Sequence, residues 1–275
     1  MKWRDILAWF DRPLRLETIV AQRYKIESVI GMGSYGFTYI VNDLQLQEKK
    51  VLKQLRQSKQ RYSSGRKSFA YEQMILKQLE HREIPSLYDQ FIWKKQPFFV
   101  MEHMPGKNFE DFIFIDGHVY EEREVFHILY KVLELVAYFH SKGIIHRDLR
   151  IPNILMQDDR IFIIDFGLAR PMGEKDERAS FYEGEQAHMR EIHYRSDFYA
   201  LGHFVLFLLY SGYDSAEIEE KPWYEELQLE EYSCEVILRM LQMKQPYYEN
   251  VQDVMKDVRQ VLEKEKVGDP CFKSF

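Results

Sequence analysis

Residues 146–167 read HRDLRIPNILMQDDRIFIIDFG, and the rest of the chain can be interpreted around this stretch. Two short apolar runs, 154–156 and 161–164, each have the length of a buried strand, and the polar residues between them predict a tight turn. A hairpin of this kind fixes the backbone at both ends. Its mouth would present Asp148, Asn153 and Asp165, so that one carboxylate is available as a base and the other, with the amide, can bind a cation.

The composition is typical of an ordered, soluble protein with a substantial core. Of the 275 residues, 45% are hydrophobic and 30% are charged, which excludes the disordered class. The formal net charge of −6 argues against nucleic acid as the main partner. Cys234 and Cys271 are the only cysteines. They are too few for a disulfide framework or a zinc site, so a reducing, cytoplasmic location is expected.

The chain divides near Gly106 into a strand-rich part and a helix-rich part. The predicted strands are 24–30, 37–41, one that ends at Lys53, 87–91 and 97–101. The predicted helices are 69–80, 121–142, 195–212, 223–243 and 250–265. The polar stretches 57–67 and 168–193 are predicted to be loops.

Two other stretches bear on membrane association. The longest apolar run, 198–213, is too short to cross a bilayer comfortably and predicts a buried core helix, so no transmembrane segment is expected. Residues 3–10 have the pattern of an amphipathic helix, which we interpret as an extra helix packed on the nearest lobe. A peripheral membrane contact through residues 1–12 is the alternative.

Residues 31–36, GMGSYG, form a glycine-rich turn between two predicted strands. A dinucleotide-binding motif needs a helix after the last glycine, but residues 37–41 are β-rich, so that interpretation fails. A glycine-rich turn between strands instead forms a flap whose amides can approach phosphates. Lys53 follows at the end of a strand, and Glu72 lies on a predicted helix. Taken alone, such a pair is typical of solvated surface.

Together, HRDL, the asparagine and DFG, preceded by the glycine-rich turn, Lys53 and Glu72, closely resemble the eukaryotic-type (Hanks-type) protein kinase superfamily. The similarity is greatest to the short bacterial serine/threonine kinases and covers residues 24–262. It implies an α+β, bilobal protein-kinase-like fold with an N-terminal extension at 1–23, a small strand-rich N-lobe at 24–104 and a larger helical C-lobe at 105–275.

The resemblance implies a role for each polar group in the opening stretch. Asp148 would orient the attacking hydroxyl and accept its proton. Asn153 and Asp165 would hold Mg²⁺, with Mn²⁺ as an alternative ion, because hard cations prefer oxygen ligands. Asp197 matches a buried aspartate that anchors the backbone of the catalytic loop.

The resemblance also implies an ATP site. Lys53 would contact the α- and β-phosphates and be held in place by Glu72. Met101 matches the gatekeeper, and residues 102–104 match the hinge whose backbone binds adenine. The expected nucleotide-binding residues are Gly31, Met32, Gly33, Gly36, Thr38, Val51, Lys53, Met101, Glu102, His103, Met104 and Leu155.

Three residues near the expected site depart from the family pattern. Arg150, included among the catalytic residues, stands where most serine/threonine kinases carry lysine. Its forked side chain would contact the γ-phosphate in another geometry than lysine does. Whether the chain phosphorylates serine and threonine or tyrosine therefore stays open. Thr38 and Val51 stand where valine and alanine usually cover the adenine, so Val51 adds bulk to that pocket.

The segment after DFG departs further. Residues 183–185, EGE, replace the family motif APE, and Tyr247 replaces the arginine that usually pairs with its glutamate. The ion pair that braces this segment is therefore expected to be missing. The candidate phosphorylation sites are Ser180 and Tyr182, with Arg147 as the phosphate partner.

We expect a protein kinase that transfers the γ-phosphoryl group of ATP to serine/threonine hydroxyls of a protein of unknown identity, with autophosphorylation. An ATP-binding or scaffolding pseudokinase is the first alternative. It is weakened because a module freed from catalysis has no chemical reason to keep Lys53, Glu72, Asp148, Asn153 and Asp165. A small-molecule kinase is the second alternative, which Arg147 opposes. The activating signal and the oligomeric state stay open.

Overall fold

The computed structural model divides the chain into two compact units. The first comprises Met1–Met104 and Ile164–Leu168, and the second comprises Pro105–Ile163 and Ala169–Phe275. The sequence-based boundaries place 164–168 in the second part instead. The structure describes residues 11–33, 36–175, 182–213 and 221–264. The amphipathic helix predicted at 3–10 lies outside these residues.

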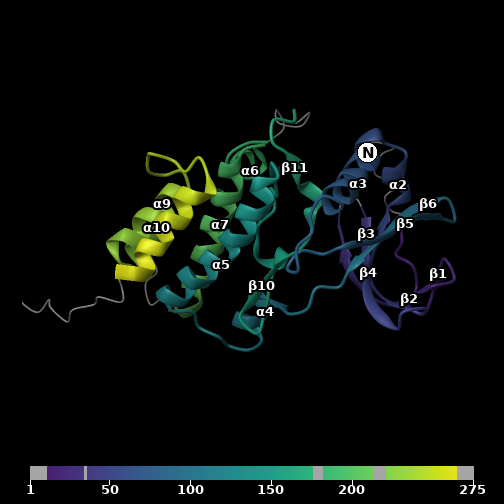
Figure 1. Cartoon of the computed structure of the whole chain (residues 1–275). Coiled ribbons are helices and arrows are strands. Elements are labelled where there is room, and N and C mark those ends of the chain that lie inside the picture. The colour runs from purple at the N-terminus through teal and green to yellow at the C-terminus, as the bar shows by residue number, and fades with distance from the viewer. Residues whose placement is uncertain (1–10, 34–35, 176–181, 214–220, 265–275) are drawn as a thin grey trace, which may run out of the picture. The chain divides into compact units, whose positions relative to one another are not determined.

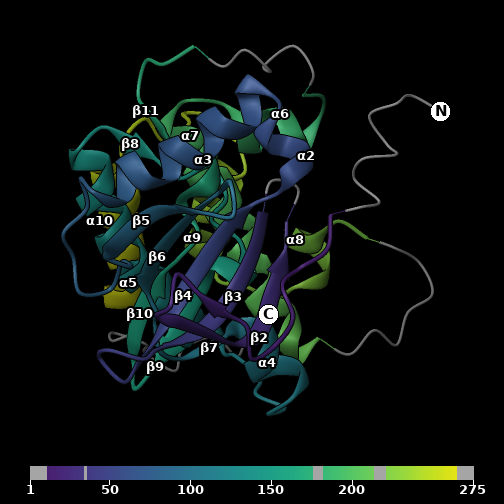
Figure 2. The ribbon, with the colours of Figure 1, turned by 90° about the vertical axis from the view of Figure 1, so that its right-hand side faces the viewer.

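An antiparallel sheet dominates the described part of the first unit (Figure 2). Its strand order is β1-β2-β3-β4-β6-β5. This arrangement confirms the predicted strands to within a few residues at their ends. The strands are β1 (Ile19–Val20), β2 (Tyr24–Met32), β3 (Gly36–Asp43), β4 (Glu48–Leu55), β5 (Leu87–Trp93) and β6 (Gln96–Glu102).

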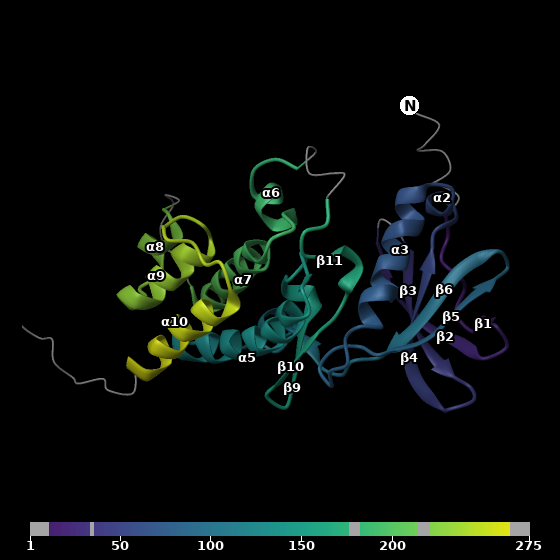
Figure 3. The same ribbon diagram turned by 45° about the horizontal axis from the view of Figure 1, so that its top comes forward.

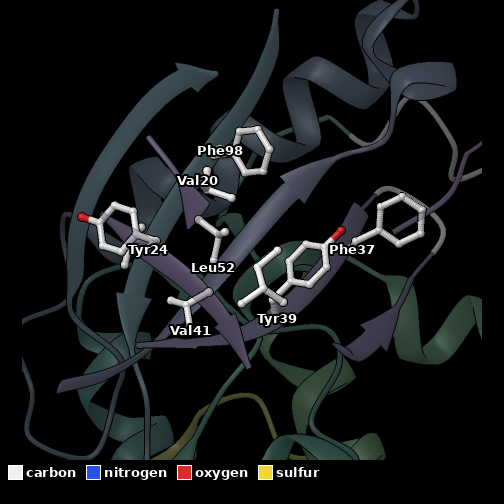
Figure 4. Packing of buried hydrophobic residues seen from close by; sticks show 9 residues of the cluster. Val20, Tyr24, Phe37, Tyr39, Val41, Leu52 and Phe98 are labelled. Atoms are coloured by element: carbon white, nitrogen blue, oxygen red, sulfur yellow. The ribbon is translucent and has the colours of Figure 1, made fainter. Parts of the chain in front are cut away.

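The two faces of this sheet have different roles. One face carries a buried apolar cluster, shown in Figure 4, that comprises Val20, Tyr24, Ile26, Phe37, Tyr39, Val41, Leu52, Phe98 and Val100. Because successive side chains of a strand alternate, Thr38, Val51 and Lys53 share the other face. The register pairs Thr38 with Lys53 and Val51 with Met101 across adjacent strands. The alternation therefore gathers several predicted nucleotide-binding residues on one surface.

The loop predicted over 57–67 is wrong. The chain forms α2 (Gln57–Gln60) and then α3 (Ser63–Leu76), which begins six residues before the predicted helix over 69–80 and ends four residues before it. The charged and polar residues of this stretch are compatible with an exposed helix, so their polarity did not exclude one.

Tertiary contacts explain why these helices form where they do. Asp11 accepts hydrogen bonds from both the backbone N–H (3.2 Å) and the hydroxyl of Ser58, near the start of α2. At Gly65, an added Cβ would lie 2.5 Å from the carbonyl oxygen of Lys59. Only glycine therefore allows α3 to begin this close to α2.

Helices form most of the described part of the second unit (Figure 1). α5 packs against both α7 and α10 (Figure 3). Gly143, at φ +69°, follows the end of α5 as predicted. The helices are α4 (Phe109–Phe114), α5 (Glu122–Ser141), α6 (Glu185–Arg190), α7 (Tyr194–Leu209), α8 (Trp223–Glu226), α9 (Glu231–Met240) and α10 (Val251–Lys264).

Two predicted helices and one predicted loop need correction. The helix over 195–212 ends as α7 at Leu209, and a 3₁₀ turn follows. The helix over 223–243 is interrupted between α8 and α9, where the backbone N–H of Glu230 donates to Glu122 of α5 (3.4 Å). The loop over 168–193 contains α6. α7 is buried over most of its length, which confirms the predicted core helix. Among the described residues, no helix has both the length and the apolar character needed to cross a membrane.

Short strands frame the stretch 146–167. β8 (Ile144–Ile145) pairs with β11 (Arg170–Pro171). β9 (Ile154–Gln157) and β10 (Arg160–Ile163) form the predicted hairpin, visible in Figure 3, and β9 also pairs with β7 (Lys107–Asn108). The hairpin turns through Asp158 and Asp159, both at positive φ, as tight two-residue turns require.

Candidate active site

Asp197 holds the backbone of the loop that follows β8. Its fully buried carboxylate accepts hydrogen bonds from the backbone N–H of His146 (2.9 Å) and of Arg147 (2.7 Å). It also lies 2.9 Å from Nε2 of His140. Arg147 has φ +65°, a conformation that a non-glycine residue adopts only when its surroundings enforce it. The carboxylate of Asp197 supplies part of that restraint.

Asp148 lies directly after this strained residue, and its carboxylate is surrounded by donors. Asn153 donates from Nδ2 to both the carbonyl oxygen and Oδ2 of Asp148, each at 2.9 Å. Nη1 of Arg190 lies 3.1 Å from Oδ1, and Nε of Arg150 lies 3.2 Å from the same atom. Asp148 is therefore buried and fixed in orientation. Because the Asn153 amide donates through nitrogen, its oxygen is presented as an acceptor.

Lys53, Glu72 and Asp165 form a second charged cluster, in the first unit. Nζ of Lys53 forms a salt bridge with Glu72 and lies 2.9 Å from Oδ1 of Asp165. Gly167 donates its backbone N–H to the same Asp165 oxygen (3.2 Å). A Cβ at Gly167 would lie 3.1 Å from that oxygen and 3.4 Å from a carboxylate oxygen of Glu72. Glycine at this position therefore permits the close approach of the two carboxylates.

The electrostatics of this cluster follow from burial and from its excess of negative charge. Burial by itself lowers the pKa of Lys53, but the charges of Asp165 and Glu72 outweigh it, so the pKa is raised. Burial raises the pKa of Glu72, and the charge of Asp165 adds to that rise while Lys53 opposes it. Lys53 thus stays protonated at every physiological pH.

The predicted nucleotide-binding residues of the first unit lie on or next to its sheet. Gly31 and Met32 end β2, Gly33 follows, and Gly36 begins β3. A Cβ at Gly36 would lie 2.5 Å from the carbonyl oxygen of Gln54, so this glycine is needed for the close approach of β3 and β4. Ser34 and Tyr35, within the turn, lie outside the described residues.

The remaining predicted nucleotide-binding residues are distributed as follows. Met101 and Glu102 end β6, and His103 and Met104 follow; Met101 and Met104 are buried. Glu102 is bonded to Ser86 through its backbone N–H, which donates to the Ser86 carbonyl oxygen (2.9 Å). Leu155 lies on β9 in the second unit, half-buried.

The segment after DFG is held by contacts other than the family ion pair. The side chain of Glu185 is exposed, and its charge acts on Tyr199 and His203 rather than on an arginine. Instead Glu249 lies 3.5 Å from Nε2 of His193 and 3.6 Å from Nη1 of Arg195. Tyr182 and Arg190 line a cavity of about 420 Å³ in this segment. Ser180, the other candidate phosphorylation site, lies outside the described residues.

Sequence reasoning missed Arg190. It ends α6, in a stretch interpreted as a loop, and its partners lie 42 and 43 residues earlier in the chain. Arg147, which stays the predicted phosphate partner, donates from Nε to the carbonyl oxygen of Arg190 (2.9 Å). No local pattern in the sequence points to either contact.

Comparisons with known proteins agree with this geometry. Residues 24–270 match the family model described as a protein kinase domain. The chain is 34% identical over 256 residues to the probable serine/threonine-protein kinase YbdM of Bacillus subtilis (strain 168), covering 92% of this chain and 95% of the relative. It is 32% identical over 229 residues to the serine/threonine-protein kinase PknA of Nostoc sp., covering 75% of this chain and 40% of the relative.

A solved structure gives the same fold. The kinase domain of Mycobacterium tuberculosis PknI superposes with a TM-score of 0.65 at 20% identity, covering 90% of this chain and 99% of that domain. The family model spans most of the sequence, including both charged clusters. The chain belongs to the protein kinase family.

Proposed function

We propose that the chain is an ATP-dependent protein kinase that phosphorylates serine and threonine hydroxyls of a protein. The observation that carries this proposal is that both charged clusters are complete: Lys53 is paired with Glu72, and Asp148 with Asn153. Relatives named as serine/threonine-protein kinases support the choice of acceptor.

The residues present fit a nucleotide and a divalent cation. Lys53 supplies a permanent positive charge for phosphate oxygens, fixed by two carboxylates. Asp165 and the amide oxygen of Asn153 are hard oxygen ligands suited to Mg²⁺, and Mn²⁺ would accept the same ligands. When bound, Mg²⁺–ATP supplies the phosphoryl group and neutralises charge on the phosphates.

The chain's own residues then handle the acceptor. Asp148 orients the acceptor hydroxyl and takes its proton as the oxygen becomes a nucleophile. Asn153 restrains the carboxylate through Oδ2. Arg150, with a side chain that is 66% exposed, keeps a permanent charge beside Asp148 that can also meet a phosphate oxygen.

Purified full-length chain incubated with labelled ATP and Mg²⁺ tests the proposal. We expect transfer of label to the chain itself and to dephosphorylated casein. The rate should fall by about 10²–10⁴-fold in Asp148→Asn, the loss expected for a general base. Lys53→Ala should lose transfer as well. Asp159→Asn in the hairpin turn and Lys49→Ala on β4 are matched controls with exposed side chains, and should retain activity within about twofold.

Phosphoamino-acid analysis of the product resolves the acceptor class. The chain has only two threonines, Thr18 and Thr38, so we expect autophosphorylation mainly on serine. Phosphotyrosine alone would contradict the assignment. If the wild type binds ATP but labels no protein, the pseudokinase alternative replaces this proposal; label found only in a small molecule would establish the second alternative.

The place of action is part of the same proposal. We place the kinase in the cytoplasm, supported by the sequence's low cysteine content. Sedimentation with vesicles of the chain with and without residues 1–12 tests the peripheral-contact alternative. Unchanged partitioning would end it.

A further inference from the structure

Arg147 and Arg190 form a reciprocal pair, in which each guanidinium donates to the backbone carbonyl of the other residue. Arg147 donates from Nε (2.9 Å) and Nη2 to the carbonyl oxygen of Arg190. Arg190 donates from Nη1 to the carbonyl oxygen of Arg147 and lies 3.1 Å from Oδ1 of Asp148. A single side chain thus joins the end of α6 to two successive residues of the catalytic loop.

The contact acts on the peptide that precedes the base. Arg147 is held in a left-handed conformation, and Asp197 binds its backbone N–H. Arg190 binds its carbonyl group, on the side that leads into Asp148. The strained residue is therefore restrained at both ends, and the direction in which Asp148 leaves the loop depends on both restraints.

The contact also acts on the carboxylate itself. Arg190 and Arg150 both approach Oδ1, whereas Oδ2 has the Asn153 amide as its donor. Each carboxylate oxygen offers about two acceptor directions. Oδ1 is thereby filled by two guanidinium groups, and Oδ2 keeps a direction for the acceptor hydroxyl.

The two arginines differ in how firmly they are held. The side chain of Arg150 is 66% exposed, whereas that of Arg190 is 18% exposed and contacts both the carbonyl oxygen of Arg147 and the carboxylate of Asp148. Arg190 is therefore the more fixed restraint on the base. Arg190 lies in the segment after DFG, where EGE replaces APE. Without the family ion pair, this segment needs another connection to the catalytic loop.

We propose that Arg190 is a positioning residue that couples the segment after DFG to the base Asp148, orienting its carboxylate so that Oδ2 receives the proton. The inference rests on the proposed kinase function. It assigns to this segment a link to the catalytic loop that does not use the glutamate–arginine ion pair.

Single-turnover phosphoryl transfer to dephosphorylated casein tests this assignment. Arg190→Ala should slow the transfer step by about 10²-fold, the effect of misplacing a reacting group, while ATP affinity changes less than about twofold. Arg190→Lys keeps the charge but not the forked geometry, so it should recover about a tenth of the wild-type rate. Millimolar methylguanidine should restore transfer in Arg190→Ala, a response that a purely structural role would not give.

A control variant on the same helix separates positioning from general damage. Gln186→Ala removes an exposed side chain and should keep the wild-type transfer rate within about twofold. If Arg190→Ala lowers the thermal midpoint, Arg190→Lys decides between positioning and structural damage. Partial recovery of the transfer rate with wild-type ATP affinity supports positioning.

Several results would overturn the inference. Transfer by Arg190→Ala at the wild-type rate, or faster, would show that Arg190 does not position the base. Absence of methylguanidine rescue together with weakened ATP binding would indicate a structural role only. An inactive wild type would remove the proposed function and this inference with it, whereas an active wild type, an inactive Asp148→Asn and an unaffected Arg190→Ala would remove this inference alone.

Discussion

The two charged clusters have opposite arrangements. In the first unit one cation, Lys53, lies between the carboxylates of Glu72 and Asp165. In the second unit one carboxylate, Asp148, lies between the guanidinium groups of Arg190 and Arg150. The first cluster carries one net negative charge and the second one net positive charge.

In each cluster one outer partner is enclosed and the other reaches solvent. The enclosed partners are Glu72 and Arg190, with side chains 6% and 18% exposed; the open partners are Asp165 and Arg150, at 46% and 66%. The enclosed partner fixes the central group, and the open partner can turn to a ligand. This difference indicates that Asp165 suits an added cation and Arg150 suits an added anion.

Removing the central charge should give the largest difference in stability between the two clusters. Lys53→Met leaves two carboxylates without their cation, one of them buried, and should destabilise the chain by about 3–5 kcal/mol. Asp148→Asn keeps an acceptor oxygen at this position, leaves Arg190 its bond to the carbonyl oxygen of Arg147, and leaves Arg150 exposed to solvent, so it should cost less than about 1 kcal/mol. Thermal unfolding of both variants beside the wild type measures the difference. Equal losses would show that enclosure of the outer partner does not matter.

The second cluster depends on a support that the first does not have. Asp197→Asn converts an acceptor of three contacts into a group with one acceptor oxygen, so at least one buried donor loses its partner. We expect a loss of about 2–3 kcal/mol in stability together with a slower transfer step. Ser196→Ala, at the adjacent buried position, removes the hydrogen bond from its hydroxyl to the carbonyl oxygen of His193 and is the control for the loss of one buried hydrogen bond. Transfer at the full rate in Asp197→Asn would contradict the anchoring role.

A one-to-one pair in the first unit provides a further comparison. Asp43 is buried and binds Arg23 through two contacts, of 2.8 and 2.6 Å. The hydrogen bonds from Arg23 hold the pKa of Asp43 below its usual range, against the effect of burial. The stability it contributes is therefore present above the unfolded pKa, near 3.8, and is lost as the pH falls through the lower folded value.

Asp43→Asn should accordingly lower stability by about 1–2 kcal/mol at pH 7, and the difference from wild type should shrink below about pH 4. Urea unfolding at the two pH values measures it. A difference that is constant with pH would assign the effect to packing rather than to charge.

The smallest expected effect concerns the start of α2. Asp11→Ala removes the acceptor for Ser58 and should cost about 1 kcal/mol, as for other helix-capping residues. Hydrogen exchange should increase at the amide of Ser58 and not in the hairpin of β9 and β10. Equal exchange at the amide of Ser58 in the wild type and in Asp11→Ala would mean that Asp11 does not hold this helix.

The parts of the fold that the sequence predicted are those with local signals. The hairpin at 154–163 has two apolar runs and a polar turn, and the sheet strands alternate, so the ends of these strands were predicted to within a few residues. α2 and α6 were missed because their determinants are contacts distant in sequence: Asp11 with Ser58, and the pair of Arg190 with Arg147.

The candidate site was predicted to the same extent. Motif spacing predicted site roles for Lys53, Glu72 and Asp148; the structure pairs Lys53 with Glu72 and Asp148 with Asn153, and the roles themselves stay predictions. It could not identify Arg190, since nothing in its surroundings distinguishes it from other arginines in a polar segment. A guanidinium that binds a carbonyl 43 residues away leaves no periodic trace in the sequence.

Gly167 offers a way to alter the first cluster without changing its charges. Ala at this position adds only a methyl group, yet that group would lie 3.1 Å from Asp165 and 3.4 Å from Glu72. A saturation library at residue 167, selected for kinase activity, should therefore retain glycine almost alone. The largest side chain that residue 167 tolerates would then measure how far α3, which carries Glu72, can move before the ion pair between Lys53 and Glu72 breaks.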